Sequence, residues 1–170
     1  VPSPLASEFA EPGGEISMYA SQFPKSFNYQ IENNVFSREI FRLMFEQLLT
    51  IDDVTLTFGP GIANRWEVSE DKKQFTFHID PRAHWSDGKP ITAEDVAWSF
   101  NAVKNPEHLT GPLQASMKRL IEIEALDEKT VRITADEVHW KNQLACSMFY
   151  IMPKHWCCLL YTSPSPRDTE

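Results

Sequence analysis

The chain has 170 residues, of which 42% are hydrophobic and 24% are charged, and its formal net charge is −8. This composition is ordinary for a globular protein. The acidic balance argues against nucleic-acid binding, because neutralising phosphates requires clustered Lys and Arg side chains. The longest apolar runs fall well short of the roughly 18–20 residues that span a membrane. The first residues lack the basic and apolar segments of a signal peptide, so we expect one to have been removed or never included.

The first fifty residues combine a flexible start with a loop and a helix. The range 1–14 holds three Pro and two Gly residues and is predicted to be a flexible lead-in. Alternation over 15–20 predicts a strand, and the polar and aromatic range 24–34 predicts a loop. Ser37 is a suitable N-cap for a helix from Arg38 to about Thr50, along which apolar residues recur at helical spacing.

The block from residue 66 to residue 100 carries the strongest local signals. Trp66–Val68 and Gln74–Ile79 are strand-like runs joined by a polar connection, which predicts a hairpin. Alternation in the second run predicts one apolar face, formed by Phe75, Phe77 and Ile79.

A turn and a helix start complete this block. Ser86–Pro90 contains Asp-Gly, a turn signal because Gly tolerates positive φ. Thr92 is placed to cap a helix, with Asp95 as its capping-box partner and Glu94 in the positive first turn. Asn105-Pro106 is predicted to end this helix.

The remaining elements favour an α+β fold. Lys118–Leu126 and Thr130–Thr134 flank an Asp-Glu-Lys turn and predict a second hairpin, and Asn142–Tyr150 predicts a short helix. The range 156–170 has neither a helical nor a strand period, and it holds two Pro residues within three positions. We interpret 156–170 as a non-native junction tail and 15–155 as the folded part.

Four motifs follow one another in the block 66–100. They are Trp66-Glu67-Val68-Ser69, Phe75-Thr76-Phe77-His78-Ile79, Trp85-Ser86-Asp87-Gly88-Lys89-Pro90 and Thr92-Ala93-Glu94-Asp95-Val96. Their order and spacing resemble the signature region of the family 5 extracellular solute-binding proteins, the peptide-binding receptors of ABC importers. The resemblance extends over roughly residues 16–155 of this chain.

The resemblance implies a fold and a function. The implied fold is the N-terminal lobe portion of a two-lobed, type II periplasmic-binding-protein-like architecture, whose second lobe lies outside this chain. The implied function is binding of di- or oligopeptides, in the periplasm or at the cell surface, for uptake through an ABC permease in the membrane. No catalysis, no cofactor and no metal are implied, and the complete receptor is expected to be a monomer. The breadth of the family leaves oligosaccharide, nickel and opine-like solutes open as alternatives.

The candidate ligand contacts lie in the loop before the first helix: Phe27, Asn28, Tyr29, Asn33 and Asn34. Loops between a strand and a helix often carry ligand contacts. Aromatic rings with a few amide groups suit a pocket that is mostly apolar, and the start of this loop resembles the ligand-side loop of the family. An Asn-rich loop that only turns and caps the chain is the alternative interpretation.

An enzyme hypothesis, a metal-dependent hydrolase, would use His78, Asp80 and His84, with Asp87 close by. A catalytic zinc site needs three convergent ligands with oriented outer partners. Pro81 and the Asp-Gly turn redirect the chain between these residues, so we expect half-exposed polar positions opposite an apolar strand face instead.

Other reactive groups have simpler interpretations. Cys146 is expected to be a buried, inert thiol, whereas Cys157 and Cys158 lie in the suspected tail. Glu94 and Asp95 are interpreted as caps and not as an acid/base pair, because adjacent helical residues do not face each other. The sequence contains no nucleophile elbow and no P-loop.

Overall fold

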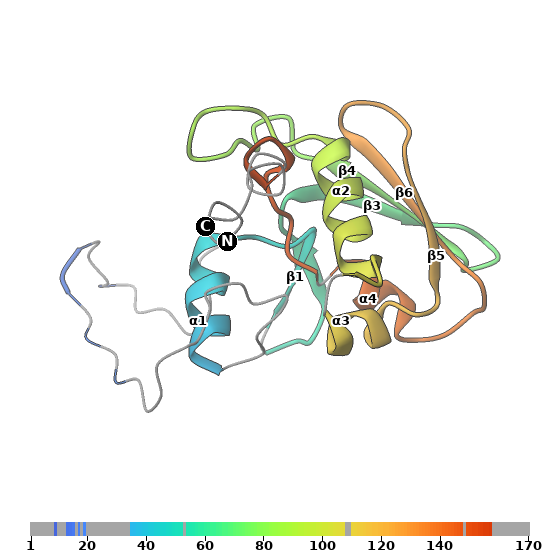
Figure 1. The fold of residues 1–170 in the computed structure, drawn as a ribbon, viewed down its shortest axis with the longest axis horizontal. Coiled ribbons are helices and arrows are strands. Elements are labelled where there is room, and N and C mark those ends of the chain that lie inside the picture. The colour runs from blue at the N-terminus through green and yellow to red at the C-terminus, as the bar shows by residue number, and fades with distance from the viewer. Residues whose placement is uncertain are drawn as a thin grey trace, which may run out of the picture.

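A computed structural model of the chain describes residues 9, 13–15, 17, 19, 35–52, 54–107, 110–147 and 149–157. Within these ranges the main elements run in the order α1 (Val35–Met44), β1 (Leu49–Ile51), β2 (Phe58–Pro60), β3 (Ala63–Val68), β4 (Gln74–Ile79), α2 (Ala93–Lys104), α3 (Gly111–Ser116), β5 (Leu120–Ala125), β6 (Thr130–Ala135) and α4 (Asn142–Ser147) (Figure 1). The fold is therefore α+β, as the sequence predicts. No helix among the described residues is both long and apolar enough to cross a membrane.

Both hairpins that the sequence predicts are present in a four-stranded antiparallel sheet with the order β3-β4-β6-β5. In the first hairpin Trp66 lies opposite Phe77, and in the second Ile123 lies opposite Ile133. β4 and β6 join the two hairpins, with Phe77 opposite Val131. A smaller sheet pairs β1 with β2.

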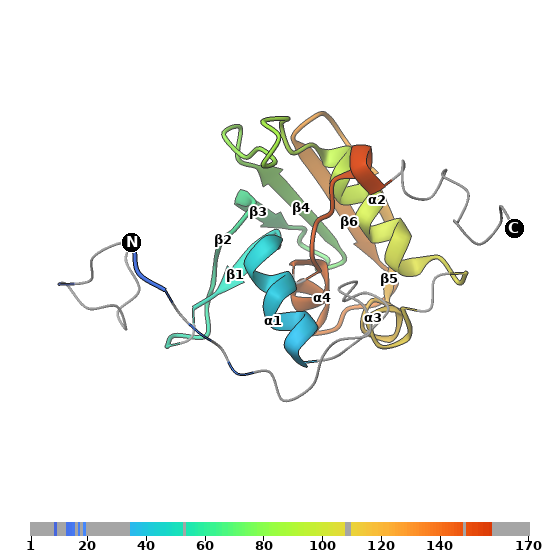
Figure 2. The same cartoon turned by 60° about the vertical axis from the view of Figure 1, so that its left-hand side comes forward.

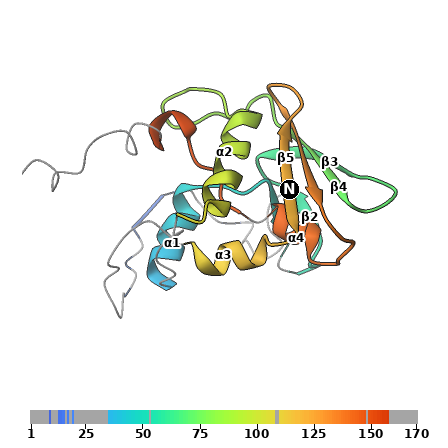
Figure 3. The same cartoon turned by 45° about the vertical axis from the view of Figure 1, so that its right-hand side comes forward.

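β4 and β6 carry the core face of the sheet. The predicted alternation in β4 is confirmed, because Phe75, Phe77 and Ile79 are buried while the residues between them are not. α2 packs against β5 and β6 (Figures 2 and 3). Its buried side chains join the same cluster through Val96, Phe100 and Val103.

The start and end of α2 are where the sequence places them. The Asp95 N–H donates to Thr92 Oγ1 at 3.3 Å, and the Thr92 N–H donates to Asp95 Oδ2 at 3.0 Å, which forms the predicted capping box. Glu94 lies in the first turn, and the helix ends at Lys104 with Asn105 as its C-cap.

The helix predicted over 38–50 is shorter and begins earlier. α1 runs from Val35 to Met44, so that Ser37 is buried inside the helix and is not its N-cap. Leu49–Ile51 is a strand. The predicted boundaries were wrong at both ends.

Distant backbone partners explain the extended conformation after α1. The carbonyl oxygens of Gln47 and Leu48 accept hydrogen bonds from the N–H groups of Ile62 and Ala63, at 3.0 and 2.9 Å. These bonds satisfy carbonyl groups that a longer helix would have satisfied internally. Leu48 and Leu49 are both fully buried, so these two apolar residues reflect burial of successive side chains and not one face of a helix.

The close approach of these two segments requires glycine at position 61. A Cβ atom on Gly61 would lie 2.6 Å from the Gln47 carbonyl oxygen and 3.0 Å from that of Leu48. A side chain at this position would push the two segments apart.

Smaller differences concern the other elements. The predicted helix over 142–150 is confirmed as α4, which ends at Ser147. α3 has no counterpart among the predicted elements. Of the range 15–20, predicted as a strand, the structure describes Glu15, Ser17 and Tyr19, and none of these three lies in a strand.

The last described residues form a helical turn over 154–157. The N–H groups of Trp156 and Cys157 donate to the Pro153 carbonyl oxygen, at 3.1 and 3.0 Å, and Cys157 is buried. The interpretation of 156–170 as a non-native tail stays a prediction. The first two residues of this range, Trp156 and Cys157, form backbone hydrogen bonds to Pro153.

Deleting residues 158–170 is expected to leave the free energy of unfolding unchanged within about 0.5 kcal/mol, the usual range for changes outside a core. Deleting 156–170 should cost about 1 kcal/mol, because the small apolar side chain of Cys157 is then lost from its buried position. Urea denaturation of the two shortened chains measures the difference. A large loss on the smaller deletion would contradict the tail interpretation.

Candidate functional site

The structure fixes the position at which the predicted ligand loop leads into the fold. Phe27, Asn28, Tyr29, Asn33 and Asn34 lie outside the described residues, whereas α1 begins directly after them, at residue 35. The first turn of α1, α3 and α4 lie in the lower half of the molecule in Figure 1, and the loop over 80–91 lies at its upper end.

A pocket of about 360 Å³ lies in this lower half, which we call the α3–α4 pocket. It is lined by Leu113, Ala115, Ser116, Met117, Arg119, Leu120, Lys141, Asn142, Leu144, Ala145 and Phe149. Most of these side chains are apolar, and the lining includes two cations and no carboxylate among the described residues. A mostly apolar wall with a few polar groups is the usual chemistry of a small-molecule site.

A larger groove of about 710 Å³ lies at the other end of α1, which we call the Trp85 groove. It is lined by Met44, Phe45, Glu46, Gly61, Ile62, Asp80, Arg82, Ala83, His84, Trp85, Ser86, Asp87, Ile91, Pro153 and Trp156. This groove mixes aromatic side chains with charges of both signs.

Two carboxylates that line the Trp85 groove, those of Asp80 and Asp87, are paired with neighbouring side chains. Asp80 Oδ2 lies 2.8 Å from Arg82 Nη2, and the hydrogen bonds from Arg82 lower the pKa of Asp80 to about 2. Asp87 Oδ2 lies 2.8 Å from His155 Nε2. A backbone hydrogen bond from Lys89 and then the contact with His155 lower the pKa of Asp87. Both acids are therefore held in their charged form at neutral pH.

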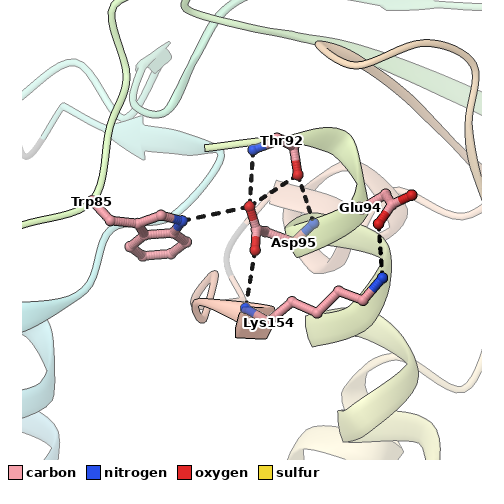
Figure 4. A network of polar contacts seen from close by, with 5 residues as sticks. All are labelled: Trp85, Thr92, Glu94, Asp95 and Lys154. Atoms are coloured by element: carbon pink, nitrogen blue, oxygen red, sulfur yellow. Dashed lines mark hydrogen bonds and ion pairs between the residues drawn. The ribbon is translucent and has the colours of Figure 1, made fainter. Parts of the chain in front are cut away.

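The buried carboxylate of Asp95 contacts Trp85, one of the residues that line this groove (Figure 4). Asp95 is 5% exposed, and its Oδ2 accepts from the N–H and Oγ1 of Thr92, both at 3.0 Å, and from Trp85 Nε1 at 3.5 Å. Its Oδ1 accepts from the Lys154 N–H at 2.9 Å, while Lys154 Nζ lies 2.7 Å from Glu94 Oε2. Asp95 thus connects the start of α2 to Trp85, which lines the groove, and to the backbone N–H of Lys154, which follows the lining residue Pro153.

The residues of the metal hypothesis do not converge. His78 lies within β4, while His84 and Asp87 lie in the loop that follows it, where His84 Nδ1 donates to the Arg82 carbonyl oxygen at 2.9 Å. Asp80 forms its ion pair with the same arginine. Among the described residues no three His, Cys, Asp or Glu side chains are arranged to hold a metal ion.

Cys146 is a buried thiol, as the sequence predicts. It lies in α4 with no exposed surface, and burial raises its pKa above the ordinary value. The thiol form is favoured at neutral pH, so this side chain is a poor nucleophile.

Residues 57–163, more than half of the chain, match the family model of the bacterial extracellular solute-binding proteins, family 5. The chain belongs to this family. The resemblance seen in the sequence is confirmed by this match, which continues past Trp156 into the range interpreted as a tail.

Relatives of the family 5 chain include two peptide-binding proteins. The dipeptide-binding protein of Escherichia coli is 26% identical over 166 residues, which cover 86% of this chain and 31% of that protein. The periplasmic oligopeptide-binding protein OppA of Salmonella typhimurium is 43% identical over 67 residues, covering 39% of this chain and 12% of that protein. The chain thus spans a third or less of these curated relatives.

A solved structure shows the same fold. The PBP AgaA from A. tumefaciens R10, in complex with agropinic acid, has a TM-score of 0.72 and 25% identity, covering 84% of this chain and 29% of that one. This family 5 chain therefore has the fold of one portion of a type II periplasmic binding protein, as predicted.

Proposed function

We propose that this chain is part of the substrate-binding component of an ABC importer that binds di- or oligopeptides. The observation that carries the proposal is the match to a dipeptide-binding protein over 86% of the chain. The match to a periplasmic oligopeptide-binding protein supports the same solute class and a periplasmic or cell-surface location. The proposed role is binding without catalysis, which accords with a family of solute-binding proteins.

The proposed mechanism is closure of two lobes around the peptide, followed by recognition of the closed form by the membrane permease. Main-chain hydrogen bonds to the peptide and tolerant, partly wet side-chain pockets would provide affinity. We propose that Phe27, Asn28, Tyr29, Asn33 and Asn34 form part of one wall. These residues directly precede α1, whose first turn lies in the same half of the molecule as the mostly apolar α3–α4 pocket (Figure 1). That position supports the proposed wall.

If this chain supplies only one wall of the peptide site, we expect it to bind peptides weakly on its own. A micromolar complex is worth about 8 kcal/mol, and losing half of it leaves an affinity near millimolar. Isothermal calorimetry of the 170-residue chain with dialanine and trialanine should therefore show no measurable heat of binding. Micromolar binding by the isolated chain would show that it is a self-contained module and would contradict the proposal.

A hybrid receptor provides the positive test. This chain would replace the matching segment of the Escherichia coli dipeptide-binding protein, and the folded hybrid should bind dialanine in calorimetry. Replacing the five loop residues Phe27, Asn28, Tyr29, Asn33 and Asn34 with Ala should weaken binding at least tenfold. The matched control replaces Glu70 and Lys72, which are exposed in the β3–β4 turn, and should leave binding unchanged. A folded hybrid that binds no peptide would overturn the proposal.

A second candidate solute class is favoured by one observation. The binding protein AgaA, which shares this fold at 25% identity, was solved with agropinic acid. A hybrid that binds agropinic acid and not dialanine would support this class over peptides.

A further inference from the structure

We propose that the α3–α4 pocket takes the apolar C-terminal end of a short peptide, with Lys141 attracting its carboxylate and Arg119 assisting. This inference rests on the proposed peptide-binding function, and it assigns one end of the ligand to a defined place on the described surface. The volume of about 360 Å³ lies at the lower end of the range of roughly 300–1,000 Å³ for small-molecule sites.

The pocket wall suits an aliphatic or aromatic side chain. Its apolar residues come from three elements, with Leu113 and Ala115 on α3, Leu120 at the start of β5, and Leu144 and Ala145 on α4. Burying an apolar side chain against such a wall is favourable because it removes apolar surface from water. The wall therefore supplies affinity for an apolar group without fixing its identity.

The charged side chains that line the pocket are positive, whereas the net charge of the whole chain is negative. The chain carries a net charge of −8, yet the charged residues that line the pocket are Arg119 and Lys141, with no acid in the described lining. A concave surface lined by one sign of charge concentrates ligands of the opposite sign. The pocket is thus suited to an apolar group that bears a carboxylate.

The contacts of Lys141 and Arg119 indicate which of them attracts a carboxylate more strongly. Lys141 Nζ lies 5.0 Å from the centre of the Trp140 ring, a contact that positions the ammonium group and leaves its charge in place. Arg119 Nε donates to Glu137 Oε1, which offsets part of its charge. Its guanidinium carries further N–H donors that can reach an anion. We therefore assign the larger effect to Lys141.

The test compares an acid with its neutral amide. N-acetyl-L-leucine and N-acetyl-L-leucinamide have the same apolar side chain, and only the first carries a carboxylate. Titration of the ¹⁵N-labelled chain with each compound up to about 20 mM reaches the millimolar affinities expected of one wall. The acid should shift the amide signals of Ala115, Ala145 and Phe149. The neutral amide should bind about fivefold more weakly, as for an exposed ion pair.

Two variants with the same change of charge isolate the role of the pocket. Lys141→Gln should weaken binding of the acid about fivefold and leave binding of the neutral amide unchanged. Lys118→Gln removes a neighbouring exposed charge that does not line the pocket, and it should change neither affinity more than twofold. A dispersed spectrum of each variant shows that it has folded.

Several results would overturn the assignment. These are equal binding of acid and amide, equal effects of the two variants, shifts confined to the Trp85 groove, and no shift at the highest concentration. The hybrid receptor separates this inference from the proposed function. If the hybrid binds dialanine and Lys141→Gln in that hybrid has no effect, the peptide function stands and this site is wrong.

Discussion

Replacing Phe77 with Ala should lower the free energy of unfolding by about 3–5 kcal/mol, because a buried aromatic side chain is lost and a cavity remains. Phe77 is 1% exposed and lies on β4, which pairs with β3 on one side and β6 on the other. Its ring therefore sits at the centre of the sheet, where the surrounding strands have little freedom to collapse into the space. The loss is a large part of the roughly 5–15 kcal/mol that stabilises a typical domain.

The adjacent residue provides the control. His78 faces the other side of β4, where Nε2 lies 3.1 Å from Arg65 Nη2 and 3.5 Å from Glu67 Oε1. Polar contacts of this partly exposed kind are worth about 1 kcal/mol or less, so His78→Ala should cost little. Urea denaturation of both variants, with comparison of midpoints and slopes, measures the difference. Equal losses, or a larger loss at His78, would contradict the assigned strand faces.

Elements whose signals are local could be predicted from the sequence. Alternation in Gln74–Ile79 depends on the period of a strand, and the Thr92–Asp95 box depends on residues three apart. In both cases the chain neighbours that determine the conformation are within a few residues. The two hairpins and the start of α2 were therefore predicted correctly.

The segment after α1 could not be predicted in this way. Its carbonyl partners are the N–H groups of Ile62 and Ala63, which lie some fifteen residues further along the chain. Apolar residues spaced as Phe45, Leu48 and Leu49 fit a helical stripe and an extended segment with successive buried side chains equally well. Only the long-range pairing distinguishes the two, and the close backbone approach at Gly61 becomes visible only in the structure.

The candidate site was predictable in part. The family followed from ordered motifs, whereas the proposed ligand residues 27–34 lie outside the described part of the chain. The sequence also indicated a cap at Asp95 without indicating that the Lys154 N–H, 59 residues later, would bind the same carboxylate. No local pattern marks a backbone donor that arrives from so far along the chain. The α3–α4 pocket was missed for the same reason, since its walls come from three separate elements.

Replacing Asp95 with Ala should lower the free energy of unfolding by about 3 kcal/mol. Loss of the capping interaction costs about 1 kcal/mol. The larger part comes from donors that lose their acceptor, because an unsatisfied buried donor costs about 1–3 kcal/mol. The Lys154 N–H and Trp85 Nε1 are both part-buried and both donate to this carboxylate. Asp95→Asn retains one carbonyl oxygen and should show an intermediate loss.

The neighbouring acid separates this effect from a loss of negative charge. Glu94 is exposed and pairs with Lys154 Nζ at 2.7 Å, so Glu94→Gln should cost less than about 0.5 kcal/mol. Tryptophan fluorescence adds a second measurement, because Asp95→Ala removes the acceptor of the Trp85 indole N–H whereas Glu94→Gln leaves it in place. If Asp95→Ala costs no more than the loss of a cap, the hydrogen bonds from Trp85 and Lys154 to this carboxylate contribute nothing to the free energy of unfolding.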